Sequence, residues 1–136
     1  MREILFRGKR LDNGEWAEGY LYEHEPALVG IVSENDVPEP SKWFIARTGF
    51  ADWNMPRPVE FVEVAPSTIG QYTGLADKNG KRIFEGDILS IWNESHDVVV
   101  FEDGAFYLEN TSIPIRFANK FEIIGNITDN PEMLEK

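Results

Sequence analysis

The stretch that decides the fold of this chain is residues 70–89, GQYTGLADKNGKRIFEGDIL. Asn79 and Gly80 predict a tight turn, because both central residues of such a turn need a positive φ. Gly86 is expected to supply an unusual backbone dihedral, and Asp87 to hydrogen-bond its local backbone and hold the next turn. The alternative for Asp87 is an exposed carboxylate that serves recognition. Since residues 88–92 follow as a strand, the stretch predicts the entrance to a small β barrel.

Working outward, apolar residues alternate along most of the chain, which is typical of strands rather than helices. Strands are predicted at residues 4–6, 16–22, 27–32, 42–48, 59–64, 88–92, 98–102, 105–108 and 121–127. Asp103-Gly104 predicts a two-residue hairpin turn, Gly125 a bulge, and Asn130-Pro131 the start of a short helix. The expected fold is all-β. An N-terminal β meander (residues 1–66) is expected to pack on a strongly bent SH3-like barrel (residues 67–136). The two regions are either separate or parts of one compact domain.

The composition narrows the classes of function. The 136 residues include no cysteine, which excludes disulfides, thiolate catalysis and cysteine zinc sites. Thirteen basic residues stand against 24 acidic ones, and the net charge of −11 disfavours contact with phosphate backbones. No segment has the apolar run of a signal peptide or a membrane helix, so we expect a cytoplasmic protein with no membrane partner.

No catalytic residue, metal ligand or cofactor site is predicted. His24 and His96 stand beside carboxylates, but solvated turn positions account for both better than a metal or a base. Asp77 begins a pattern similar to a calcium loop, yet the required glutamate at position 12 is Ile88. The glycines of residues 70–74 lack P-loop spacing, and no serine lies in a nucleophile elbow.

Large side chains gather in the first half of the chain, and three of them fall in a proline-bearing loop at residues 49–58. Phe50, Trp53 and Met55 are too apolar to stay exposed together on a monomer, and a loop of this kind does not bury its backbone in its own core. We therefore predict that these three residues contribute to a subunit contact and that the chain is a homo-oligomer.

The quoted stretch, the opening MREILFRGKRLDNGEWAEGYL and the closing FEIIGNITDNPEML together resemble the YopX family, small proteins of phages and prophages. That family has no established activity. The resemblance implies a phage or prophage accessory protein in a bacterial host, with an unknown phage or host protein as partner. We expect a non-enzymatic, homo-oligomeric interaction module. The alternatives are a nucleic-acid-binding small β barrel and an acidic inhibitor of a host DNA-binding protein. Binding to nucleic acid would need Arg2, Arg7, Lys9, Arg10, Lys81 and Arg82 to build one basic face.

Overall fold

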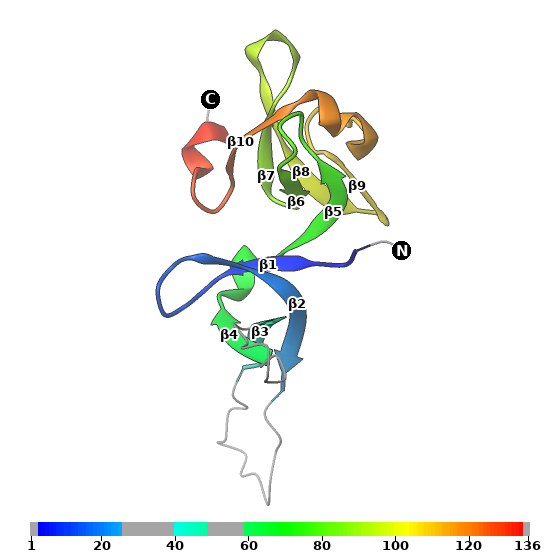
Figure 1. Cartoon of the computed structure of the whole chain (residues 1–136). Coiled ribbons are helices and arrows are strands. Elements are labelled where there is room, and N and C mark those ends of the chain that lie inside the picture. The colour runs from blue at the N-terminus through cyan, green and yellow to red at the C-terminus, as the bar shows by residue number, and fades with distance from the viewer. Residues whose placement is uncertain (1–2, 26–39, 49–58, 135–136) are drawn as a thin grey trace, which may run out of the picture. The chain divides into compact units, whose positions relative to one another are not determined.

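The computed structural model describes residues 3–25, 40–48 and 59–134 (Figure 1). The chain divides into two compact units. Phe6–Ile69 form the N-terminal unit, and Gly70–Lys136 together with Met1–Leu5 form the C-terminal unit. The sequence placed the division at residue 66, with the two regions as separate parts or as one compact domain.

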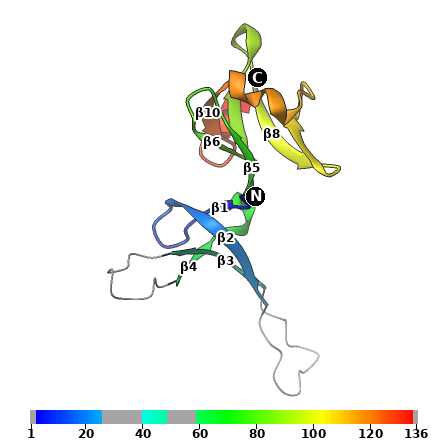
Figure 2. The same cartoon turned by 45° about the vertical axis from the view of Figure 1, so that its right-hand side comes forward.

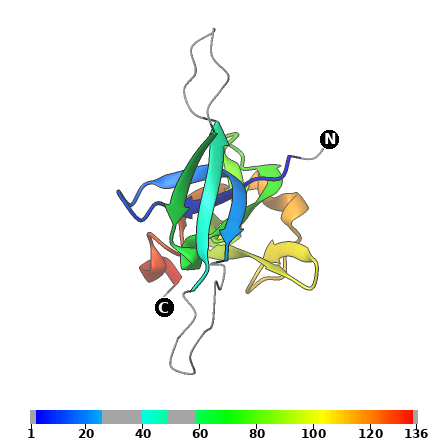
Figure 3. The same cartoon turned by 90° about the horizontal axis from the view of Figure 1, so that it is seen from below.

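The N-terminal unit is an antiparallel sheet with the order β4-β3-β2-β1. Its elements are β1 (Phe6–Lys9), β2 (Trp16–His24), β3 (Lys42–Thr48), β4 (Val59–Val64) and the 3-10 helix η1 (Pro66–Thr68). Figure 3 shows β2, β3 and β4 side by side in blue, cyan and green. Alternate residues of a strand point to opposite faces, so each strand contributes to a buried face and to an outer face.

The buried face of this sheet carries the core of the N-terminal unit, which consists of Ala17, Ile45, Val62 and Val64. The sheet curls because an antiparallel bridge joins Arg10, just beyond β1, to Val64 at the end of β4. The curl requires a very small residue at Gly8. A Cβ atom there would lie 2.9 Å from the Val64 side chain, closer than packed atoms approach.

The C-terminal unit combines a β5-β6 hairpin with a four-stranded antiparallel sheet of order β10-β7-β8-β9 (Figure 2). Its strands are β5 (Gly70–Ala76), β6 (Arg82–Phe84), β7 (Asp87–Ser90), β8 (His96–Glu102), β9 (Ala105–Leu108) and β10 (Glu122–Asn126). Three 3-10 helices, η2 (Trp92–Glu94), η3 (Ile115–Lys120) and η4 (Pro131–Leu134), complete it. Its core contains Ile83, Leu89, Val99, Leu108, Ala118 and Phe121.

The all-β fold predicted from the sequence is confirmed, but the described strands form open sheets rather than a closed SH3-like barrel. The predicted turn at Asp103-Gly104 is confirmed, with φ values of 53° and 81° and with Glu102 paired to Ala105. The register of β10 against β7 shifts between Ile123 and Gly125, which confirms the predicted bulge. The C-terminal helix is a single 3-10 segment, and the strand expected at residues 27–32 lies outside the described residues. No helix in the described ranges is long and apolar enough to cross a membrane.

Candidate interaction face

Large apolar side chains stand on the outer face of β2, β3 and β4. The cross-strand partners Tyr20, Ala46 and Phe61 share this face, because residues directly opposite each other point the same way. Tyr20 is 68% exposed, Phe61 56% and Tyr22 48%. We call this surface the aromatic face and define it as Tyr20, Tyr22, His24, Phe44, Val59 and Phe61. Exposed apolar patches of this kind mark interaction surfaces.

A cavity of about 510 Å³ lies within the aromatic face and is lined by Tyr22, His24, Phe44 and Phe61. The Tyr22 ring is close to each of the other three rings. Its centroid lies 6.4 Å from that of Phe44 and 6.0 Å from that of Phe61, which it meets edge to face at 66°. The small Ala46 lies between Tyr20 and Phe61 in the cross-strand register. It leaves space above β3 in which the Tyr22 and Phe61 rings meet.

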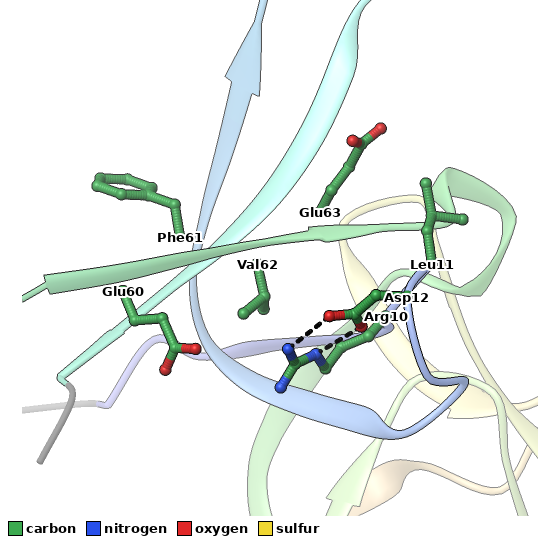
Figure 4. A pocket seen from close by; sticks show the side chains of 7 residues that line it. All are labelled: Arg10, Leu11, Asp12, Glu60, Phe61, Val62 and Glu63. Carbon is green, nitrogen blue, oxygen red and sulfur yellow. Dashed lines mark hydrogen bonds and ion pairs between the residues drawn. The ribbon is translucent and has the colours of Figure 1, made fainter.

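Two charged side chains share the face with these rings. Glu63 is opposite Phe44, and Lys42 is opposite His24. Figure 4 shows Phe61 and Glu63 on one side of β4, with Glu60 and Val62 on the other. Glu63 and Lys42 both stand on the aromatic face beside the cavity, whose own lining consists of Tyr22, His24, Phe44 and Phe61.

A smaller hollow of about 350 Å³ adjoins the aromatic face and shares Phe61 with it (Figure 4). Its lining residues are Arg10, Leu11, Asp12, Glu60, Phe61, Val62 and Glu63. Arg10 donates two hydrogen bonds to Asp12, of 2.9 and 2.7 Å, which raise the pKa of the guanidinium and lower that of the carboxyl. Glu60 accepts a hydrogen bond from Arg47 at 3.0 Å. These charges are held in ion pairs, which does not favour catalysis in the hollow.

Buried carboxylates of the C-terminal unit accept hydrogen bonds from backbone N–H groups and so fix its turns. Asp77 accepts backbone hydrogen bonds from Asn79 and Lys81 at 2.9 Å and from Ile123 at 3.0 Å. Burial raises the pKa of Asp77, but these N–H donors outweigh it and hold the pKa below its ordinary value. The carboxylate thus fixes both its own turn and the start of β10, which agrees with the turn chemistry favoured over a calcium loop.

The turn after Asp77 differs from the expected two-residue type. Gly80 has a φ of 81°, whereas Asn79 does not have a positive φ. The hydrogen bonds from Gly80 to the Asp77 carbonyl and from Asp77 to the Lys81 carbonyl close a three-residue loop. In such a loop a type I turn precedes one left-handed residue, so only the glycine needs the unusual dihedral.

Gly86 and Asp87 occupy the next turn. Gly86 has a φ of 91°, and its N–H donates to the carbonyl of Val99 at 2.8 Å. Asp87 is buried, and its carboxylate accepts a hydrogen bond from the Phe84 N–H at 2.8 Å. The turn between β6 and β7 is thus tied to β8 through Gly86 and to the end of β6 through the Asp87 side chain, and Asp87 is not exposed for recognition.

Sequence reasoning did not single out Asp97. It is fully buried and accepts hydrogen bonds from the backbone of Val98, from Asn110 and from Thr111. Burial raises the pKa of Asp97, but these donors outweigh it and keep the pKa below its ordinary value. Asp97 therefore stabilises the segment that follows β9.

The two histidines lie apart from any metal-binding arrangement. His24 lines the cavity of the aromatic face, and the Nε2 atom of His96 contacts the carbonyl of Met133. Within the described residues, no three histidine or carboxylate side chains are grouped to hold a metal ion.

Phe50, Trp53 and Met55, the residues that the sequence predicted at a subunit contact, lie outside the described residues. The sequence analysis noted the aromatic residues of the first half but did not assign a surface to Tyr22, Phe44 and Phe61. The sequence did contain a signal for this surface. Tyr20 and Tyr22 are two residues apart in a strand, so their side chains share the face opposite to that of Leu21.

Comparison with known proteins identifies the family. The family model for YopX protein matches residues 6–135. This chain belongs to the YopX family. The fold of the YopX-family chain resembles the crystal structure of protein EF1440 from Enterococcus faecalis. The two share 23% sequence identity over 99% of this chain and 100% of the other, with a TM-score of 0.55. No curated protein matches the sequence.

Proposed function

We propose that this protein is a non-enzymatic interaction module of a phage or prophage, acting in the cytoplasm of the bacterial host. Its binding surface is the aromatic face. The exposure of Tyr20, Tyr22 and Phe61 on a regular sheet carries this proposal. A fully exposed aromatic side chain presents about 150–250 Å² to water, so the face offers several hundred Å², a size at which patches are often functional.

The rest of the described structure supports a binding role over catalysis. The buried carboxylates Asp77, Asp87 and Asp97 are each engaged by backbone N–H groups. A general acid or base needs a side chain that reaches substrate, and these three serve turns instead.

We also propose that the module is homo-oligomeric, through the loop that carries Phe50, Trp53 and Met55. This part rests on the sequence of residues 49–58. Nucleic acid is the weaker alternative, because several of its proposed basic residues make contacts within the chain. Arg10 pairs with Asp12, and Arg7 stacks over Trp16 at 4.6 Å.

Site-specific crosslinking tests the binding surface. A photoreactive phenylalanine analogue replaces Tyr20 in the full chain, and the same analogue replaces exposed Leu75 of the C-terminal unit as a control. In phage-infected host cells we expect one adduct from position 20 that position 75 does not give. Adding Phe61→Ser should remove that adduct, and the crosslinked protein, once purified, should bind wild type more tightly than Phe61→Ser. Equal adducts from both positions, or an adduct that survives Phe61→Ser, would contradict the proposal.

A further inference from the structure

We propose that the cavity of the aromatic face receives an arginine side chain from a basic segment of the partner protein. This inference rests on the proposed function, because it specifies what occupies the same face. Three features carry it, namely the arrangement of the rings, the position of Glu63 and the size of the cavity.

The rings offer their π faces to a cation. A guanidinium is attracted to an aromatic ring when it lies within about 6 Å of the ring centroid. The Tyr22 centroid is 6.0 Å from that of Phe61 and 6.4 Å from that of Phe44, so these rings pack against one another, and a cation that rests on the cluster can lie near more than one ring. The chain already uses this contact internally. The guanidinium of Arg7 lies 4.6 Å from the Trp16 ring, and that of Arg82 lies 5.6 Å from the Tyr72 ring.

The charges on the face favour one end of the cavity for the cation. Glu63 lies opposite Phe44 and on the same side of β4 as Phe61, so a carboxylate stands beside these two rings. Lys42, opposite His24, is two residues before Phe44 on β3 and so stands further from Phe61. A guanidinium bound toward Phe61 gains ring contacts and Glu63 as an ionic partner, and the net charge of −11 attracts basic proteins over longer distances.

The size of the cavity suits a whole side chain. Its volume of about 510 Å³ lies in the range of small-ligand pockets and exceeds that of a guanidinium group alone. The methylene stem of arginine packs on apolar surface while its head reaches a polar partner. A second copy of this chain would bring a net charge of −11 to a face that already carries Glu63, which is unfavourable.

A peptide titration tests the charge requirement directly. The probes are acetyl-Gly-Arg-Gly-amide and its citrulline counterpart, which has nearly the same shape but no charge. We expect the arginine peptide to shift the amide signals of Tyr22, Phe44 and Phe61 in NMR spectra of the full chain. It should bind roughly threefold or more tightly than the citrulline peptide, the ratio expected from a cation–π contact.

Variants test the proposed position of the cation. Glu63→Gln should weaken binding of the arginine peptide, because it removes the ionic partner of the cation. Lys42→Gln should strengthen it, because it removes a like charge from the same face. Tyr20→Ser is the matched control, because Tyr20 is on the aromatic face but does not line the cavity. It should leave peptide binding unchanged.

Several outcomes would overturn the inference. Equal binding of the two peptides would make the cavity an apolar site, and no shift with either would exclude arginine. A lower mass of Phe61→Ser in light scattering would place a second copy on the face. If the crosslinked partner binds Glu63→Gln as it binds wild type but fails to bind Phe61→Ser, the cation is wrong and the proposed function stands. An adduct that survives Phe61→Ser instead refutes the proposed function.

Discussion

Replacing Asp97 with asparagine should strongly destabilise the C-terminal unit. The Oδ2 atom of Asp97 accepts hydrogen bonds from the Thr111 N–H and hydroxyl, both at 2.9 Å, and one from the Asn110 N–H at 3.1 Å. In the asparagine variant an NH2 group would take the place of Oδ2. It would face the N–H groups of Asn110 and Thr111, which cannot accept a hydrogen bond from it. Hydrogen bonds to charged groups contribute about 1.5–3 kcal/mol each, so losing two of them should lower the free energy of unfolding by about 3–6 kcal/mol.

The pH dependence of this effect follows from the lowered pKa of Asp97. A carboxyl whose pKa is lower in the folded state stabilises the fold above its unfolded pKa, which is about 3.9. That contribution is lost as the pH falls through the lower, folded-state pKa. The difference between wild type and Asp97→Asn should therefore be full at pH 7 and should shrink below about pH 4.

Urea unfolding followed through the NMR amide signals of Val98 and Val99 measures this prediction within the C-terminal unit. Asp103→Asn is the matched control, because it removes the same charge from the same hairpin at a φ of 53°, which asparagine tolerates. The control should unfold like wild type. A loss of less than about 1 kcal/mol in Asp97→Asn, or one that does not depend on pH, would refute the role given to these hydrogen bonds.

Three further predictions concern the turn, nucleic acid and self-association. Gly80→Val should lower the melting temperature measured by circular dichroism, because a bulky residue at a φ of 81° costs about 1–2 kcal/mol. Gly80→Asn should lower it less. Equal melting temperatures for wild type and Gly80→Val would exclude the loop geometry described. The protein should not bind duplex DNA at physiological salt, since cations such as Arg10 are paired with carboxylates; micromolar, salt-sensitive binding in fluorescence anisotropy would restore that alternative. Trp53→Glu should lower the mass measured by light scattering and leave the strand signal intact; a wild-type protein that is already monomeric would contradict self-association.

Much of the strand pattern follows from local sequence. Residues 42–48, 59–64 and 105–108 were predicted as strands and have those bounds in the structure. Each of these runs is short, rich in apolar or β-branched residues and bounded by turn or proline-containing segments, so neighbouring residues determine it. The two-residue turn at Asp103-Gly104 was predictable for the same reason.

The candidate site could not be predicted in this way, because it depends on register. Tyr22, Phe44 and Phe61 come from three strands, and a shift of one residue in any of them would turn its ring to the other face. Asp97 shows the same limit, since its partners Asn110 and Thr111 follow 13 and 14 residues later along the chain. Alternation shows which residues share a side of one strand, but not which strands lie next to each other.

The division of the chain into units has a consequence for how the protein is made. The C-terminal unit includes Leu5, whose carbonyl accepts a hydrogen bond from the Tyr72 N–H at 2.8 Å, while the intervening residues form the other unit. The N-terminal unit is thus inserted into the C-terminal unit. The chain leaves the C-terminal unit after Leu5 and re-enters it at Gly70, close to the same place. During synthesis the whole N-terminal unit leaves the ribosome before residues 70–134 do. Only afterwards can the C-terminal unit pack around residues 3–5. Because Leu5 and Tyr72 are already hydrogen-bonded, a short linker in place of the N-terminal unit should let the C-terminal unit close.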